Sequence, residues 1–238
     1  CVLAAEPGSG DEQSHQLLGP VVTHRFCTRT AALFFPALVA CGCDPDGVGG
    51  GAVISSSGLW SAPEGTLYTL RMLSAGAEAG ADTAIFPEES SLLAYVEAGG
   101  CAAGDGVRLS LREGGSWAEG TPKGGFHFVL SGGDADAGLA LCGYETEGGN
   151  VEYLDSPLPF WEGSGVAEGE AVSAGEWSLV ATVVDEQPTY YGIFRSAARF
   201  DVSNASGSPA PWSITLAPGF GMIVLQTETF TADLVRVR

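Results

Sequence analysis

Two short pairs of glutamates have a spacing that could support acid–base chemistry. Glu145 and Glu147 are two residues apart, as are Glu168 and Glu170. Side chains at this spacing lie on one face of a β-strand, and two carboxylates flanking a glycosidic bond can cleave it as acid and nucleophile or base. Glycines border each pair, which favours loops or strand ends. We expect no catalysis from these glutamates, and they remain the candidates for an enzymatic alternative.

Three tryptophans are candidates for binding. Trp117, Trp161 and Trp212 lie in segments rich in Gly, Ser and Pro, which predicts surface loops. An indole face exposed in a loop can stack on a sugar ring. The alternative is that the three rings only pack their own loops. Trp177 begins an apolar strand and is predicted to lie in the core.

A short acidic turn is the candidate metal site. Asp134 and Asp136 lie among glycines, and carboxylate oxygens in a flexible turn suit Ca²⁺. A plain solvated turn is the alternative. His127, between two phenylalanines, is predicted to be a structural residue and not a base. The sequence contains no G-x-S-x-G, H-E-x-x-H or C-x-x-C motif, so no other cofactor is expected.

The composition excludes one class of partner. The 238-residue chain has 10 basic and 29 acidic residues and a formal net charge of -19. Nucleic-acid binding needs clustered Lys and Arg to displace counterions from phosphates. We therefore expect no nucleic-acid partner. With 45% hydrophobic residues, the chain can bury a core.

The segment from Arg29 to Cys43 has the layout of an export signal. Basic residues precede an apolar run over 31–40, which ends in Leu-Val-Ala-Cys. This tetrapeptide resembles the lipobox of bacterial lipoproteins, which implies cleavage before Cys41 and lipidation of its sulfur. Residues 22–40 would then be the signal peptide, and 1–21 an untranslated or disordered upstream segment. The alternative is a buried helix over 31–40, which Pro36 disfavours.

The lipid is the expected membrane attachment. The run over 31–40 is shorter than the about 20 apolar residues that a spanning helix needs. The glycine- and aspartate-rich residues 41–52 are predicted to form a flexible tether. We therefore expect a lipid-anchored protein of the bacterial cell envelope, at the outer membrane or cell surface.

The remainder of the chain, 53–238, is predicted to be an all-β domain. Short alternating or β-branched runs are separated by Gly, Pro, Asp and Ser clusters, and no long helical period occurs. The expected strands cover 66–73, 91–97, 107–112, 125–131, 139–144, 177–184, 190–195, 199–202, 212–216, 222–226 and 232–238.

The C-terminal third resembles a known family. Gly175-Glu-Trp177-Ser-Leu-Val-Ala-Thr-Val-Val184, then Tyr191-Gly192 and Thr231-Ala-Asp-Leu-Val-Arg-Val237, are similar to strands of laminin G-like, concanavalin A-type domains. The resemblance implies an antiparallel β-sandwich, or jelly roll. Some members of the concanavalin group hydrolyse polysaccharides with paired carboxylates. Two tandem immunoglobulin-like sandwiches are the alternative fold.

The cysteines are consistent with export. If Cys41 carries lipid, Cys101 and Cys142 are the remaining pair, and a disulfide is expected outside the cytoplasm. Two free buried thiols are the alternative, and the fate of Cys43 stays open. The sequence thus predicts a non-catalytic lipoprotein that binds carbohydrate or a cell-envelope protein. A polysaccharide hydrolase and a purely structural adhesion module are the alternatives.

Overall fold

The computed structural model describes residues 53–80, 91–101, 106–163 and 165–238. Within these ranges the chain forms β-strands and no α-helix. No helix in this part of the chain is long and apolar enough to cross a membrane. The strands are β1 (Val53–Ser55), β2 (Leu67–Ser74), β3 (Ser91–Ala98), β4 (Gly106–Glu113), β5 (Thr121–Ser131), β6 (Asp134–Glu145), β7 (Val151–Glu162), β8 (Gly165–Ala167), β9 (Ala171–Ala174), β10 (Trp177–Pro188), β11 (Ile193–Asn204), β12 (Trp212–Ala217), β13 (Gly221–Gln226) and β14 (Phe230–Val237).

All fourteen strands belong to one hydrogen-bonded sheet. Its order is β1-β8-β7-β6-β5-β4-β3-β2-β14-β13-β12-β11-β10-β9, and all of these neighbours pair antiparallel. Strands β2–β8 therefore form one meander and β9–β14 a second. The pairing of β2 with β14 joins the two meanders into a single sheet.

The all-β, antiparallel prediction is confirmed, but the connections differ from those expected. Consecutive strands lie next to each other, whereas a jelly roll needs long Greek-key connections. The strands also do not divide into two tandem immunoglobulin-like sandwiches, because β2 pairs with β14 across the proposed boundary near residue 150. The two runs expected over 190–195 and 199–202 belong to one long strand, β11.

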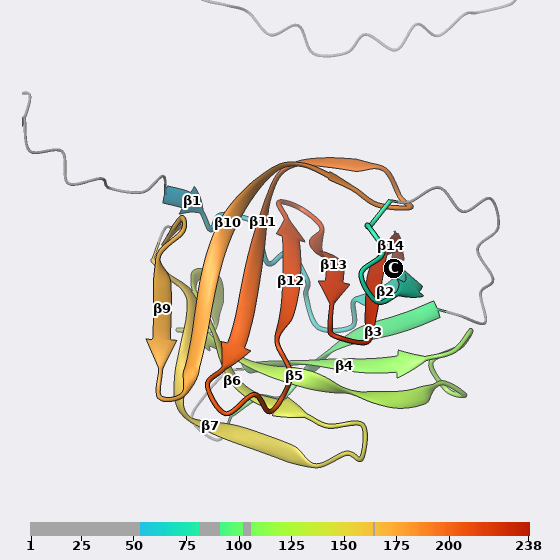
Figure 1. The fold of residues 1–238 in the computed structure, drawn as a ribbon, viewed down its shortest axis with the longest axis horizontal. Helices are drawn as coiled ribbons and strands as arrows, with labels where there is room; N and C mark the ends of the chain where they lie inside the picture. The colour runs from blue at the N-terminus through green and yellow to red at the C-terminus, as the bar shows by residue number, and fades with distance from the viewer. Residues whose placement is uncertain (1–52, 81–90, 102–105, 164) are drawn as a thin grey trace, which may run out of the picture. The chain divides into compact units, whose positions relative to one another are not determined.

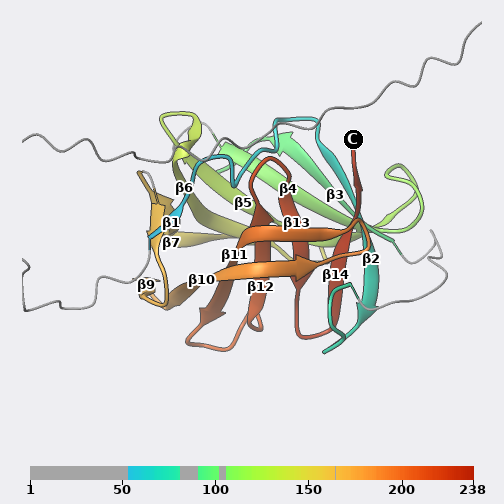
Figure 2. The ribbon, with the colours of Figure 1, turned by 90° about the horizontal axis from the view of Figure 1, so that it is seen from above.

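The sheet bends so that its two meanders face each other. Figure 1 shows β10–β13 standing upright while β4, β5 and β7 run across the view, and Figure 2 shows the same crossing from above. Crossed strands of this kind are typical of orthogonal sheet packing, in which long strands bend at the corners. Strands β10 and β11, of 12 residues each, arch over one end.

The core lies between the two meanders. Phe126 and Phe160 from β5 and β7 meet Trp212 and Phe200 from β12 and β11, with ring centroids 4.3 Å apart for Phe126–Trp212 and 5.0 Å for Phe160–Phe200. These rings are at most 8% exposed. Burying a large apolar side chain contributes about 1.5–3 kcal/mol. Trp177 is 9% exposed, which confirms its predicted place in the core.

Candidate functional site

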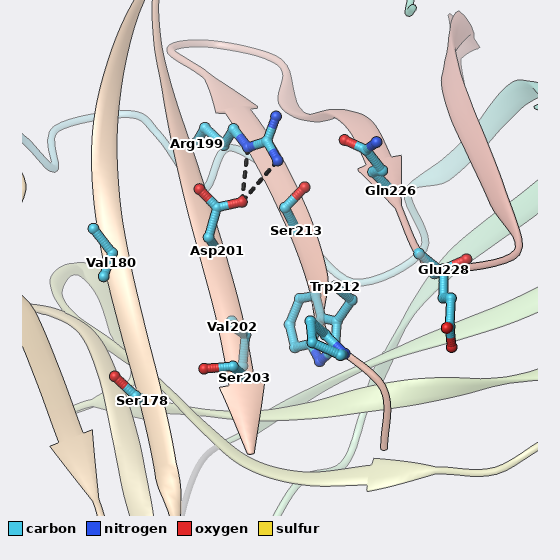
Figure 3. A pocket seen from close by; sticks show the side chains of 12 residues that line it. Ser178, Val180, Arg199, Asp201, Val202, Ser203, Trp212, Ser213, Gln226 and Glu228 are labelled. Carbon is cyan, nitrogen blue, oxygen red and sulfur yellow. Dashed lines mark hydrogen bonds and ion pairs between the residues drawn. The ribbon is translucent and has the colours of Figure 1, made fainter. Parts of the chain in front are cut away.

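A groove with several polar side chains along it crosses the outer face of β10–β13, the face that points away from the core (Figure 3). It consists of two hollows of about 470 and 380 Å³. Arg199, Ser213 and Gln226 line both hollows, so the two form one continuous depression. Figure 3 also labels Ser178, Val180, Asp201, Val202, Ser203, Trp212 and Glu228 along the first hollow.

Strand alternation places these polar side chains on one face. In β11, Phe200 is fully buried in the core, so Arg199 and Asp201 on either side of it point outward. The ladder pairs Asp201 with Ser213 on β12, and Ser213 with Gln226 on β13. Three neighbouring strands therefore contribute polar groups to one place on the surface.

An ion pair lies in the middle of the groove. Arg199 Nε and Nη2 are both 2.8 Å from Asp201 Oδ1, and the two side chains are 41% and 46% exposed. A solvated pair of this kind contributes little to stability. Among the described residues, no other group bonds to the second Asp201 oxygen or to the outer guanidinium N–H groups, so these can meet a ligand.

Other groove side chains have unused hydrogen-bonding capacity. The Ser213 hydroxyl and the Gln226 amide form no hydrogen bond with another residue in the described part of the chain. An amide offers two donors and an acceptor, and a hydroxyl offers one donor and two acceptor lone pairs. The groove can therefore bind a hydroxyl-rich ligand through both donors and acceptors.

Two of the three predicted binding tryptophans lie in strands and not in surface loops. Trp161, in β7, is 2% exposed and donates its Nε1–H to the Ala135 carbonyl at 2.7 Å. Trp212, in β12, is 7% exposed and packs against Phe126 with the two rings tilted. The surface-loop prediction is wrong for both residues, because each ring packs into the core. Trp161 offers almost no exposed surface to a sugar, and Trp212 contributes only a small exposed area to the first hollow.

Trp117 lies in the β4–β5 connection, as expected, and is partly exposed. One side of its ring contacts Tyr95, with centroids 5.2 Å apart. Arg112 lies over the ring, with Cζ 4.8 Å from the centroid, and donates from Nη1 to the Trp117 carbonyl at 3.1 Å. These neighbours account for much of the ring surface.

Three of the four paired glutamates are held by separate partners. Glu145 ends β6 and forms an ion pair of 2.5 Å with Arg108. Glu147, in the following turn, lies 3.4 Å from Lys123. Glu168 accepts a hydrogen bond of 3.1 Å from the Val183 N–H, and Glu170 is exposed. The described contacts do not join the members of either pair into one acid–base unit.

The aspartates proposed for calcium bind backbone groups. Asp134 Oδ1 accepts the Asp136 N–H at 2.9 Å, and Asp136 Oδ1 accepts the Gly58 N–H at 2.9 Å. Asp136 thereby holds the segment after β1 against the start of β6. Within the residues that the structure describes, no group of three or more His, Cys, Asp or Glu is arranged to hold a metal ion.

His127 is a buried residue on the outer face of β5. It is 5% exposed, and neither ring nitrogen has a hydrogen-bond partner among the described residues. Burial lowers its pKa below the usual 6.5, and the nearby charge of Arg108 lowers it further, while Glu145 opposes the shift. The imidazole is therefore neutral at pH 7 and packs edge-on against Tyr153, with ring centroids 5.8 Å apart.

The predicted disulfide is confirmed. Cys101 and Cys142 are bonded and lie 41 residues apart. The signal peptide, Cys41, Cys43 and the tether over 41–52 lie outside the described residues. The lipid anchor therefore stays a prediction.

Of the residues that line the groove, sequence reasoning proposed only Trp212 for binding, although a signal for others was present. The strand expected over 199–202 already places Arg199 and Asp201 on one face, opposite the apolar Phe200 and Val202. Gln226 ends the strand expected over 222–226. What the sequence did not show was that these two strands lie beside β12 with their polar sides together.

Comparison with known proteins places the chain in no family. No protein-family model and no curated protein matches it. Two solved structures resemble it weakly. A candidate lipoprotein from Parabacteroides distasonis has a TM-score of 0.40 and 10% identity, covering 77% of this chain and 100% of that one. A candidate exported protein with a YmcC-like fold from Bacteroides fragilis has a TM-score of 0.38 and 10% identity, covering 79% and 100%. Similarity at this level does not show a common fold or function.

Proposed function

We propose that this protein is a non-catalytic envelope lipoprotein whose groove on β10–β13 binds an extended carbohydrate. One observation carries the proposal: two hollows share Arg199, Ser213 and Gln226 and so form a single groove with polar side chains at its centre. A groove with several polar groups in a row suits a chain of sugar rings better than a compact ligand.

The chemistry of the groove supports a hydroxyl-rich ligand. Arg199, Asp201 and Gln226 carry planar polar groups that can engage two neighbouring hydroxyls at once. Hydrogen bonds to the charged groups are each worth about 1.5–3 kcal/mol. The partly exposed Arg199–Asp201 pair can open toward the ligand at low cost. An anionic glycan is disfavoured, because the net charge of -19 repels it.

The same residues argue for binding and not for hydrolysis. Glycoside cleavage uses two carboxylates on opposite sides of the bond, one of which delivers a proton. In the groove, the Asp201 carboxylate is engaged by Arg199. The four glutamates proposed for catalysis bind other partners or lie exposed. Glu228 in the first hollow and Glu78 in the second are the further carboxylates that line the groove.

Export to the cell envelope is supported by two features. The Cys101–Cys142 disulfide is typical of an oxidising compartment. The Leu38–Cys41 tetrapeptide has the lipobox pattern, which would anchor the chain through lipid on Cys41. Attachment through the lipid alone would leave the groove free to meet a surface polysaccharide.

A glycan array tests the proposal. The full chain is applied to neutral, cationic and anionic glycans, together with Gln226→Ala and the control Arg195→Ala. Arg195 belongs to the same strand as Arg199 but pairs with Glu186 outside the groove, where both are largely exposed. Binding that Gln226→Ala weakens and Arg195→Ala leaves intact is expected. Failure to bind any glycan would overturn the proposal.

A further inference from the structure

A second cavity lies next to the groove. It is a cleft of about 250 Å³ between the ends of β4–β6 and the segments that flank β12 and β13. Trp212, Thr227 and Glu228 line both the cleft and the first hollow of the groove. The cleft is therefore a separate site that shares one wall with the groove.

Aromatic side chains form much of the cleft wall. Phe126, Tyr144, Trp212 and Phe230 all line it. Phe126 and Trp212 belong to the core, whereas Tyr144 and Phe230 are only partly buried. Tyr144 is fixed by Trp177, with ring centroids 5.5 Å apart. Rings that are already held in place can receive a ligand without losing further side-chain freedom.

The charges around these rings are mostly negative. Three carboxylates line the cleft, those of Glu145, Glu147 and Glu228, against the single cation of Lys123. Lys123 Nζ forms ion pairs with Glu147 at 3.4 Å and with Glu113 at 3.0 Å, and Glu113 does not itself line the cleft. The charge of Glu145 is balanced by Arg108, with which it forms an ion pair.

Glu228 is the one carboxylate of the cleft lining whose charge no described residue balances in an ion pair. It is exposed and has no ion pair with another residue in the described part of the chain. A negative charge at the mouth of an aromatic cleft favours a cation, because the faces of aromatic rings also attract positive charge. Both effects point to the same sign of ligand charge.

We propose that this cleft binds an organic cation, a protonated amine carried on an apolar body. The amine lies by Glu228 and the apolar body lies against Tyr144 and Phe230. The net charge of -19 raises the local concentration of cations around the chain and disfavours an anion. This site does not depend on carbohydrate binding in the groove.

A matched pair of probes tests the site. Benzylammonium and benzyl alcohol have nearly the same shape, and only the first is charged at pH 7. Both are titrated into the full chain while the indole and aromatic resonances are followed by NMR. We expect benzylammonium to bind about tenfold more tightly than benzyl alcohol, with shifts centred on Tyr144, Trp212 and Phe230. Equal affinity of the two probes, or no binding of benzylammonium, would overturn the proposal.

Two variants separate the cleft from general surface charge. Glu228→Gln keeps the shape of the side chain and should remove most of the preference for the charged probe. Glu170→Gln removes one exposed carboxylate outside the cleft and should leave that preference unchanged. An equal loss in both variants would show nonspecific attraction and would contradict the site. Neither residue is in the core, so both variants are expected to fold.

Discussion

Arg71 and Asp233 form a buried ion pair at the junction of the two meanders. Arg71 Nε lies 3.0 Å from Asp233 Oδ1, and Nη2 lies 2.7 Å from Oδ2. The side chains are 4% and 0% exposed. Asp233 Oδ2 also accepts the Gly80 N–H at 2.7 Å. Arg71 and Asp233 are directly paired across β2 and β14, the two strands whose pairing joins the meanders in the sheet.

Asp233→Ala is expected to lower the free energy of unfolding by about 3–5 kcal/mol, because it leaves the Arg71 guanidinium buried without its carboxylate. Urea denaturation of the full chain measures the change. The double variant Arg71→Met/Asp233→Leu removes both charges and should be more stable than Asp233→Ala. A double variant that loses the sum of the two single losses would contradict this account of the pair.

The disulfide should stabilise the folded state by an amount that depends on the length of the loop it closes. Cys101 and Cys142 are 41 residues apart, for which the chain-entropy model gives a loss of about 3–4 kcal/mol when the bond is removed. Replacing both cysteines by alanine and measuring urea midpoints checks this value. Oxidised and reduced wild-type protein with equal midpoints would be inconsistent with it.

His127 should make stability depend on pH. Its folded-state pKa lies below the unfolded value of about 6.5. The unfolded chain therefore binds more protons between the two values, and the free energy of unfolding falls as pH drops through about 6.5. Below the folded-state pKa of His127, this residue no longer makes the free energy of unfolding depend on pH. His127→Leu should flatten this part of the profile, since His127 is the single histidine after residue 52. An NMR-titrated imidazole pKa above 6.5 would contradict the assignment.

Truncation of two tryptophans should destabilise the protein to very different extents. Trp161→Ala is expected to cost about 3–5 kcal/mol, because the ring fills the core against Phe160 and Phe200. Trp117→Ala, in a partly exposed connection, should cost much less. Thermal unfolding of both variants gives the comparison. A larger loss for Trp117→Ala would contradict the packing described for β7.

Strand alternation predicted most of the strands, and β7 shows why some were missed. Pro157 and Pro159 fall within it, and proline normally weakens a strand because it donates no ladder hydrogen bond. The structure tolerates both. The register with β6 shifts between Leu141 and Gly143 and again near Pro159, and the other edge of β7 pairs with β8 at Glu162 alone. Such bulges depend on tertiary packing and leave no local sequence pattern.

The groove could be predicted only in part for a related reason. The alternation in 199–202 shows that Arg199 and Asp201 share a face. That this face also carries Ser213 and Gln226 follows from the order β11-β12-β13 and from the register between these strands. Loop-rich composition around Trp161 and Trp212 suggested exposure, but the packing of the opposite meander buried both rings.

The central claim is that the groove on β10–β13 binds carbohydrate. Its most direct test uses titration calorimetry to compare the affinity of Arg199→Ala and of Arg195→Ala for the glycan that binds best on the array. The two arginines lie on one strand and each has an acidic partner, but only Arg199 lines the groove. Loss of its charged hydrogen bonds should weaken binding by about 10- to 100-fold, whereas Arg195→Ala should bind like the wild type. Equal affinity of the two variants would show that the groove is not the binding site.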